Sequence, residues 1–349
     1  MSDKTTIYDI AKKLNITAAT VSRALNDNPK ISAATRKLVM ETAVSMDYKQ
    51  NKLALALKSG KSNNVGVIVP YIDRNFFSSI IRGIEEELNP KGYHVIIGQT
   101  YEMEKKEIET INALLNAQVD GILMSISKLS KKTEQYQHVL DKNVPLVFFD
   151  RKKNIPGVST VTINDFDGGY QATKHLISQG CSTIAHLSGD RSLEIYKNRC
   201  EGYKEALLEH GLPYDENLVL QTKSDIDYGK RAVELLMKLP NRPDAIFSSS
   251  DYVALGAIQK LKEMGIKIPD EFCVVGFSNE PFTKFMELSI SSVDQSPQEM
   301  GRLAAKVFLE QGMNTGKVKI EQKVELTPEL LIRKSSSKLK ALKLGKTNL

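Results

Sequence analysis

The chain has no long hydrophobic run and no cysteine framework. None of its apolar stretches approaches the roughly 18 residues that are needed to cross a bilayer, and residues 1–6 lack the apolar core of a signal peptide. The three cysteines, Cys181, Cys200 and Cys273, are odd in number and far apart, which fits neither a disulfide framework nor a zinc module. We therefore expect a cytoplasmic protein without a membrane segment.

Motifs for catalysis and metal binding are also missing. No Gly-x-Gly-x-x-Gly follows a strand pattern, no Walker loop occurs, and residues 248–251 lack the Gly-x-Ser-x-Gly elbow of hydrolases. His186 lies within an apolar strand pattern and is expected to be a core or cleft histidine rather than a base. We expect no enzyme activity, no metal and no cofactor. The histidines without metal-ligand spacing are His94, His138, His175, His186 and His210.

The formal net charge of +6 is unevenly distributed along the chain. Residues 1–63 hold 11 Lys/Arg and 5 Asp/Glu (+6), and residues 335–349 hold 4 Lys and no acid (+4). Residues 64–334 hold 33 Lys/Arg against 37 Asp/Glu (−4). A small basic head on an acidic body indicates that only the head meets a polyanion. The basic tail is more simply a segment that aids solubility.

The basic head has the pattern of three short helices. Apolar residues recur at helical spacing over residues 7–14. Thr17 can cap a second helix over 18–25, and Ser32 a third over 33–46. Two short helices joined by a few residues and followed by a third describe a helix-turn-helix unit. The apolar face of the third helix is expected to consist of Leu38, Val39 and Ala43.

The second helix has a polar outer side that suits DNA. Small residues at its N-terminal end allow close approach to base edges, and Arg23 can fork onto guanine in the major groove. Hydroxyl and amide side chains are placed for phosphate oxygens. The alternative is an ordinary capped surface helix. The DNA-contact candidates of the head are Thr6, Tyr8, Thr17, Ala18, Ala19, Thr20, Ser22, Arg23 and Asn26.

Three segments give the head a specific likeness. Residues 6–11 (Thr-Ile-Tyr-Asp-Ile-Ala), 20–26 (Thr-Val-Ser-Arg-Ala-Leu-Asn) and 32–36 (Ser-Ala-Ala-Thr-Arg) resemble the DNA-binding headpiece of the lactose/galactose repressor (LacI/GalR) family. The resemblance implies a sequence-specific transcriptional regulator, expected to be a repressor. It also implies a homodimer on a pseudo-palindromic double-stranded DNA operator.

Residues 50–63 resemble the family's hinge helix and linker. Gln50 stands where the family usually has proline, and Leu55 where arginine is common. A leucine of this helix is implied to enter the minor groove, where an apolar wedge between base steps kinks DNA. The alternative is that the leucines pack on the body. The hinge residues implied to contact DNA are Leu53, Ala54 and Leu57.

From Val65 onward, short apolar strand patterns alternate with amphipathic helix patterns. Continuous apolar strands between helices imply a parallel sheet covered on both faces, and two successive lobes of this kind place a cleft at the carboxyl ends of their strands. The expected strands are 65–69, 93–97, 121–124 and 146–149 in the first lobe, and 183–187, 219–220, 245–247 and 273–277 in the second. The expected helices are 80–88, 108–115, 168–179, 195–210, 229–238 and 251–264.

The body, residues 64–334, resembles the family's effector-binding core, which is similar to periplasmic sugar-binding proteins. Matching segments include 68–70, 147–151, 198–203 and 274–277. We therefore expect an all-α helix-turn-helix headpiece at 1–49, followed by a two-lobe α/β core with parallel sheets that dimerises. The core is expected to bind a small-molecule effector, most simply a carbohydrate. The body alone would also permit a secreted solute-binding protein, but the head argues against that.

Candidate effector contacts follow strands or begin helices at the cleft. Asp150 could accept two sugar hydroxyls and Arg199 could donate in a fork; the alternatives are a capping or inter-lobe carboxylate and a structural ion pair. Of Phe76 and Phe77, one is expected to pack in the core. Many family members have Asp where this chain has Ser278, so a charged acceptor is lost. The full set is Phe76, Phe77, Ser125, Asp150, Arg199, Ser250, Ser278 and Gln295.

Overall fold

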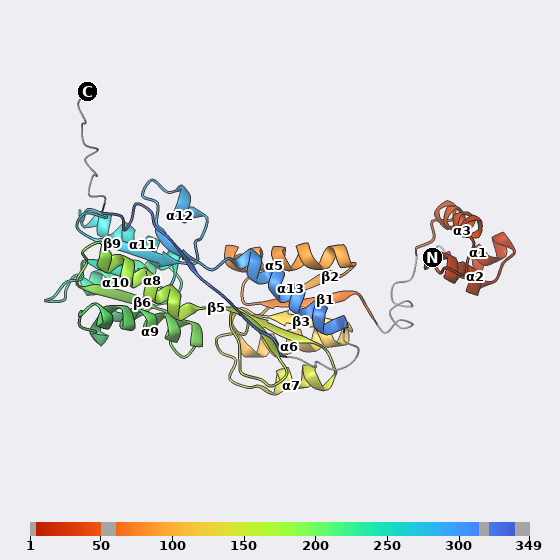
Figure 1. The fold of residues 1–349 in the computed structure, drawn as a ribbon, viewed down its shortest axis with the longest axis horizontal. Helices are drawn as coiled ribbons and strands as arrows, with labels where there is room; N and C mark the ends of the chain where they lie inside the picture. Colours follow the sequence, from red (N-terminus) through yellow and green to blue (C-terminus); the bar gives the residue numbers. More distant parts are fainter. Residues whose placement is uncertain (1–4, 50–60, 314–320, 339–349) are drawn as a thin grey trace, which may run out of the picture. The chain divides into compact units, whose positions relative to one another are not determined.

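The structure is a computed structural model that describes residues 5–49, 61–313 and 321–338. The chain divides into two compact units, Met1–Ser62 and Asn63–Leu349 (Figure 1). Each unit is described by itself. The hinge candidates Leu53, Ala54 and Leu57 lie outside the described residues, as do residues 339–349 of the basic tail.

The headpiece consists of the three expected helices. They are α1 (Ile7–Leu14), α2 (Ala18–Leu25) and α3 (Ala33–Ser45). The prediction for α3 was wrong in one respect, because Leu38 points to solvent and is 51% exposed, whereas Thr42 is turned inward beside Val39. The small core that the helices share is formed by Ile10, Ala11, Val21, Ala24, Val39 and Ala43.

Side-chain caps set where the headpiece helices begin. The hydroxyl of Thr17 accepts a hydrogen bond from the amide of Thr20 at 3.2 Å, and Ser32 accepts one from the amide of Thr35 at the same distance. Each bond satisfies an amide that has no partner within its helix, and such a cap contributes about 1 kcal/mol. The turn between α1 and α2 is therefore held at the start of α2.

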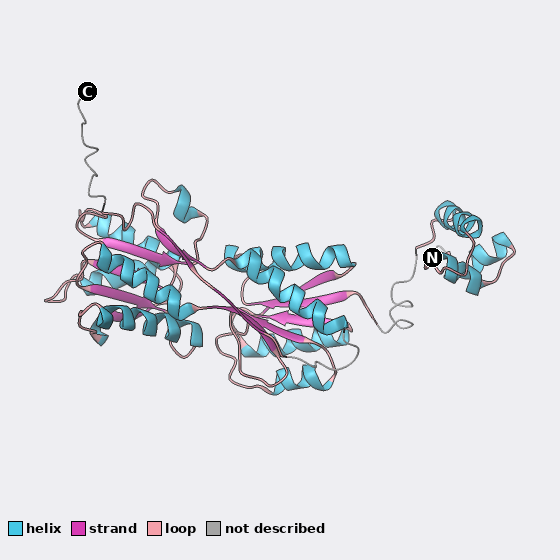
Figure 2. Ribbon diagram, viewed as in Figure 1, coloured by secondary structure: helices cyan, strands magenta, loops and turns pink. Residues whose placement is uncertain are grey.

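The body contains two α/β lobes, which confirms the predicted fold class (Figure 2). The N-terminal lobe has a six-stranded, all-parallel sheet in the order β11-β5-β4-β3-β1-β2. Its strands are β1 (Asn64–Val69), β2 (His94–Gln99), β3 (Gly121–Met124), β4 (Leu146–Phe149), β5 (Ser159–Ile163) and β11 (Lys323–Leu326). Its helices are α5 (Asn75–Leu88), α6 (Glu104–Asn116), α7 (Glu134–Asp141) and α13 (Pro297–Met313), with the 3-10 turn η1 (Asn89–Lys91).

The C-terminal lobe repeats the plan with the order β12-β10-β9-β8-β6-β7. All its pairs are parallel except β10 with β12. Its strands are β6 (Ile184–Ser188), β7 (Val219–Gln221), β8 (Ala245–Ser248), β9 (Cys273–Phe277), β10 (Ser291–Asp294) and β12 (Glu329–Leu331). Its helices are α8 (Asp165–Ser178), α9 (Glu194–Glu209), α10 (Ile226–Leu236), α11 (Asp251–Glu263) and α12 (Phe282–Phe285), with the 3-10 turn η2 (Glu216–Leu218).

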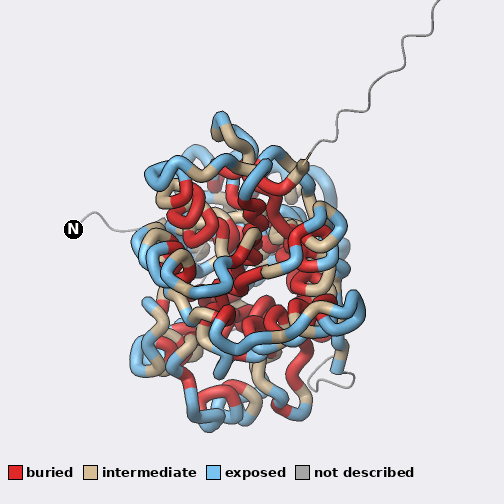
Figure 3. The backbone as a smooth tube through the Cα atoms, turned by 90° about the vertical axis from the view of Figure 1, so that its left-hand side faces the viewer, coloured by how far each residue is buried: buried red, intermediate tan, exposed pale blue. Residues whose placement is uncertain are grey.

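The chain crosses between the lobes three times, which the sequence did not predict. The crossings lie between β5 and α8, between β10 and α13, and between β11 and β12. Helix α13 packs on α5 and β11 pairs with β5, so segments near the C-terminus complete the N-terminal lobe. In Figure 3 the buried segments of the body are enclosed by exposed turns and outer helix faces. In the described part of the chain, no helix has the length and apolarity to span a membrane.

Pairs of glycines let three pairs of helices approach closely. In the pair α8 and α9, a Cβ atom on Gly169 would lie 2.2 Å from the carbonyl oxygen of Arg199, and one on Gly202 would lie 2.0 Å from that of Phe166. Only glycine permits such backbone contact. The same reciprocal arrangement joins α5 to α13 and α10 to α11, through Gly83, Gly301, Gly229 and Gly256. The close contact of α8 and α9 fixes where Arg199 stands.

Candidate functional site

Helix α2 buries one side and exposes the other. Val21 and Ala24 are in the headpiece core. The exposed DNA-contact candidates are Thr6, Tyr8, Thr17, Ala19, Arg23 and Asn26, while Ala18, Thr20 and Ser22 are half-buried. The residue types on this open face therefore suit a major groove, with Arg23 as the long cationic side chain.

Some of these candidates form hydrogen bonds within the headpiece. The hydroxyl and amide of Thr6 donate to Oδ2 of Asp9, at 2.6 and 2.8 Å. The side-chain amide of Asn26 donates to the carbonyl of Ser22 at 2.7 Å, so it closes the end of α2. Tyr8, in contrast, is 71% exposed. Sequence reasoning did not separate residues that shape the headpiece from those that face outward.

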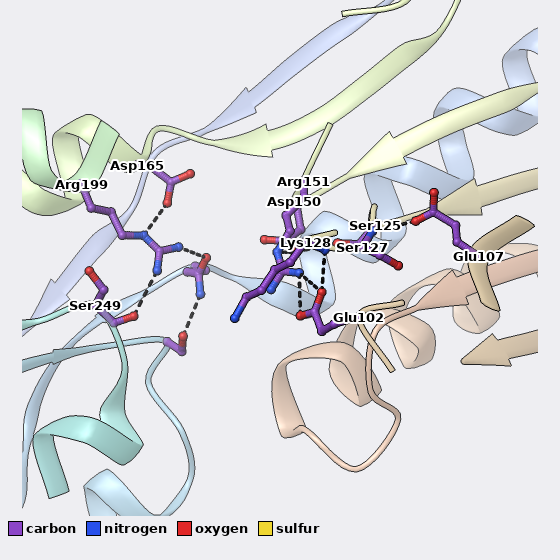
Figure 4. Close-up of polar contacts among 12 residues, drawn as sticks. Glu102, Glu107, Ser125, Ser127, Lys128, Asp150, Arg151, Asp165, Arg199 and Ser249 are labelled. Carbon is purple, nitrogen blue, oxygen red and sulfur yellow. Dashed lines mark hydrogen bonds and ion pairs between the residues drawn. The ribbon is translucent and has the colours of Figure 1, made fainter. Parts of the chain in front are cut away.

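The N-terminal lobe contributes a buried acidic and basic cluster to the cleft (Figure 4). Asp150 follows β4 with φ of 59°, a left-handed conformation that is uncommon for a residue with a side chain. Its Oδ2 accepts a hydrogen bond from the hydroxyl of Ser125 at 2.8 Å and lies 3.7 Å from Nε of Arg151. Burial raises the pKa of Asp150, while Arg151 and Ser125 oppose the rise.

Arg151 is held in turn by Glu102. Its Nη1 donates to both carboxylate oxygens, at 2.8 and 2.9 Å, and the amide of Lys128 donates to the same carboxylate at 2.8 Å. Glu102 therefore fixes the position of the Arg151 side chain within the N-terminal lobe. The guanidinium is positioned with its Nε toward Asp150.

The C-terminal lobe contributes Arg199, of which 3% is exposed. Its Nε donates to Oδ1 of Asp165 at 2.7 Å, and its Nη1 donates to the carbonyl of Ser249 at 3.2 Å. Its Nη2 donates to Oε1 of Gln295 at 3.2 Å, and the guanidinium carbon lies 3.6 Å from the ring centroid of Phe277. The structure thus shows the ion pair that was the alternative for Arg199, and Asp165 of that pair is a residue of the cavity wall.

Burial and charge act in opposite directions on Asp165. Removal from water raises the pKa of its carboxyl to about 6, although the Arg199 guanidinium opposes the rise. Gln295 extends the network by donating from Nε2 to the hydroxyl of Ser278 at 2.9 Å. Two of the predicted contacts, Ser278 and Gln295, are therefore brought together with Arg199.

A cavity of about 60 Å³ is lined by both lobes. Asp150 is part of its wall, but several polar lining residues were missed, among them Asp165, Lys152, Glu194 and Asn198. Asp165 could have been found if β5 had been recognised, because it opens the helix that follows that strand. The remaining lining residues are Ile126, Arg151, Thr162, Ile163, Leu193, Ile195 and Glu325.

Three other expectations have different outcomes. Phe76 and Phe77 both belong to the core of the N-terminal lobe, with ring centroids 5.1 Å apart, so the expectation that only one is core was wrong. Ser250 precedes α11, and its backbone carbonyl accepts from the hydroxyl of Ser248. His186 is confirmed as a core histidine, stacked on Phe247 at 4.6 Å. Burial lowers the pKa of His186 to about 3.

Comparison with known protein families covers both units. Residues 6–51 match the family model described as "Bacterial regulatory proteins, lacI family". Residues 62–328 match the model described as "Periplasmic binding proteins and sugar binding domain of LacI family". The chain belongs to the LacI family of DNA-binding transcriptional regulators.

Similar proteins agree with this membership over nearly the full length. The HTH-type transcriptional regulator DegA of Bacillus subtilis (strain 168) is 35% identical over 337 residues, with 96% of this chain and 99% of DegA covered. Catabolite control protein A of Priestia megaterium is 33% identical, with 87% and 91% covered. A solved complex of the regulator CelR with cellobiose superimposes with a TM-score of 0.71 at 27% identity, covering 95% and 100%. The Lac repressor dimer on its operator has the same fold, with a TM-score of 0.83 at 20% identity, covering 96% and 99%.

Proposed function

We propose that this regulator is a cytoplasmic, non-enzymatic repressor whose operator affinity changes when a small molecule occupies the cleft between its lobes. One observation carries the proposal: Asp150 of the N-terminal lobe and Asp165 of the C-terminal lobe line the same cavity. A molecule that contacts both walls binds one lobe arrangement better than another. The cellobiose complex of CelR and a ribose-bound LacI-family structure from Enterococcus faecium support a sugar-like effector.

The coupling would be a population shift. A ligand changes the balance of two lobe arrangements only by the difference between its affinities for them. In a homodimer, that difference would alter the spacing of the two headpieces. The dimer of the Lac repressor on its operator supports this stoichiometry.

On DNA, α2 would enter the major groove and the hinge leucines the minor groove. Arg23 would contact a base edge, and Leu57, with Leu53 and Ala54 beside it, would kink the operator. Binding-site selection from random DNA is expected to recover an inverted repeat with half-sites roughly 10 bp apart. A direct repeat or an unrepeated consensus would contradict the dimer model.

A separate experiment tests whether a molecule in the cleft changes operator affinity. Operator binding by the full chain is measured by fluorescence anisotropy with and without a sugar that the protein binds. We expect operator affinity to change at least fivefold, in either direction. An unchanged affinity in the presence of a bound sugar would refute control through the cleft.

A further inference from the structure

Two of the three cysteines, far apart in the sequence, lie together in the C-terminal lobe. Cys181 follows the turn that ends α8, and Cys273 is the first residue of β9. Their exposed fractions are 3% and 0%. The Cys181 thiol donates a hydrogen bond to the Cys273 sulfur. Cys200 belongs to the same apolar cluster, but its thiol is beside Arg191. The fold therefore brings together one pair of thiols out of three.

Asp244, which directly precedes β8, holds the backbone on both sides of this pair. Its carbonyl accepts a hydrogen bond from the amide of Cys273 at 3.0 Å, and its Oδ2 accepts one from the amide of Ser182 at 2.9 Å. The amide of Cys181 itself donates to the carbonyl of Leu176 at 3.2 Å. Main-chain hydrogen bonds therefore keep the two cysteines beside each other.

A short segment, residues 336–338, covers the pair. Sγ of Cys273 lies 3.7 Å from the carbonyl oxygen of Ser336. The amide of Lys338 donates to Oε1 of Gln179, two residues before Cys181, at 3.0 Å. Lys338 is only half-buried. Opening of this segment alone costs less free energy than unfolding the lobe, and it admits a small oxidant to the thiols.

The two thiols are unequal as nucleophiles. The hydrogen bond from Cys181 lowers the pKa of the Cys273 thiol, and the Lys338 ammonium adds to the lowering, although burial opposes it. The same hydrogen bond raises the pKa of Cys181, and burial adds to that rise. Because the thiolate is the reactive form of cysteine, Cys273 is the first to react with an oxidant and Cys181 is the second.

We propose that Cys181 and Cys273 are a redox-sensitive site, which a hydroperoxide converts to a reversible disulfide. Disulfides of cytosolic proteins are usually transient and serve catalysis or redox sensing. The pair lies at the amino end of β9, whereas the predicted effector contact Ser278 follows the carboxyl end of that strand. The disulfide joins the end of α8, whose first residue Asp165 lines the cavity, to β9.

The reaction takes place in two steps that balance. The Cys273 thiolate attacks one oxygen of the hydroperoxide, the O–O bond breaks, and the departing oxide takes up a proton. Cys273 is then a sulfenic acid. The Cys181 sulfur attacks the sulfenic sulfur, the S–S bond forms, and hydroxide leaves with the Cys181 proton as water. With hydrogen peroxide, two thiols and one peroxide give one disulfide and two waters.

The test treats the folded, fully reduced full chain with hydrogen peroxide, blocks the remaining thiols with N-ethylmaleimide and maps the peptides by mass spectrometry. We expect a linked Cys181–Cys273 peptide that dithiothreitol separates, with Cys200 blocked. In urea, Cys181–Cys200 should predominate instead, because the shorter loop closes more readily. A native product without the Cys181–Cys273 bond, whether it links Cys200, joins two chains or leaves the thiols free, overturns the proposal.

Variants then assign the order of attack. In Cys181→Ala, Cys273 should stop at the sulfenic acid, which dimedone traps, whereas Cys200→Ala should form the disulfide as wild type does. Lys338→Gln should slow disulfide formation roughly threefold at neutral pH, and the exposed Lys334→Gln, on the neighbouring stretch of chain, serves as the matched control. Absence of the dimedone adduct on Cys273, or equal rates in the two lysine variants, would overturn the assigned roles.

Discussion

The guanidinium carbon of Arg74 lies 4.6 Å from the ring centroid of Tyr252, and this contact joins the two lobes. Arg74 directly precedes α5 in the N-terminal lobe, and Tyr252 belongs to α11 in the C-terminal lobe. Lys128 lies 5.9 Å from the ring centroid of Tyr196 in a second contact of this kind. Side-chain contacts therefore hold the lobes in this arrangement in addition to the three crossings.

Removing the first contact should loosen the arrangement. A cation–π pair at a partly exposed site contributes about 0.5–1 kcal/mol. Arg74→Ala should therefore weaken a cleft ligand by about two- to fivefold if the ligand prefers this arrangement. Calorimetry of the full chain measures the effect, with the exposed Arg82→Ala on α5 as control. Equal affinities of both variants and wild type would mean that the Arg74–Tyr252 contact does not bias the lobes.

Base readout and phosphate contact can be separated in the headpiece. Arg23→Ala should cost about 1–3 kcal/mol on the preferred operator and relax one position of the consensus. Thr20→Ala should weaken specific and random DNA alike, because a phosphate contact carries no sequence information. Competition binding with random DNA provides the comparison. If Arg23→Ala weakened both DNAs equally, Arg23 would be a phosphate contact.

Asp150 offers a nearly isosteric test of hydroxyl recognition. Asp150→Asn keeps the shape but replaces a charged acceptor, and a hydrogen bond to a charged group contributes about 1.5–3 kcal/mol. The effector should bind roughly ten- to a hundredfold more weakly, whereas operator affinity without effector should stay near wild type. Calorimetry and anisotropy on the same preparation measure both quantities. If this variant bound the effector with wild-type affinity, Asp150 would not be an effector contact.

Burial of neutral His186 should lower the free energy of unfolding at acidic pH. Its pKa falls from the ordinary 6.5 to about 3 because it is buried, so the unfolded chain binds a proton that the folded chain does not. Its contribution is complete above pH 6.5 and is lost as the pH falls toward 3. His186→Phe, which keeps a ring against Phe247 and Tyr203, should remove a loss of about 2 kcal/mol between pH 6.5 and 5. Urea unfolding at these pH values measures it; parallel profiles of wild type and variant would contradict it.

The glycine contact behind Arg199 gives a further prediction. A methyl group at position 169 would collide with the backbone of α9, so α8 and α9 would have to separate. Gly169→Ala should lower the free energy of unfolding by about 1–3 kcal/mol and weaken the effector. Gly180→Ala, at the open turn after α8, is a useful contrast because its strain comes from a φ of +82° rather than from crowding. It should destabilise the protein while leaving effector affinity unchanged.

Local pattern predicted the strands whose side chains are continuously apolar. Strands β3, β4 and β9 have the bounds that the sequence indicated, because Gly121–Met124, Leu146–Phe149 and Cys273–Phe277 are buried on both faces. Strands β5 and β10, at Ser159–Ile163 and Ser291–Asp294, are rich in serine and threonine and have no comparable apolar run. Their places in the sheets depend on partners far away in the sequence.

The same division holds for the candidate site. Asp150 and Arg199 could be suggested because each follows or occupies an element with a clear pattern. The pairing of Arg199 with Asp165 could not, since Asp165 lies just beyond the unrecognised β5. Ser250 was suggested because it follows β8, but among the described residues the cavity wall is formed by others.

Because α13 and β11 lie near the C-terminal end of the chain, the two units can complete their folding at different times during synthesis. The headpiece closes its core within residues 5–48, but the N-terminal sheet needs Lys323–Leu326 to cover β5. Translation at about 5–20 residues per second leaves an interval of roughly 15–55 s between the two events. From the time that Ser159–Ile163 are made until Lys323–Leu326 follow, β5 is an open edge onto which a strand of another nascent chain could add. Ribosome-associated chaperones are therefore expected to matter more for this regulator's ligand-sensing unit than for its DNA-binding one.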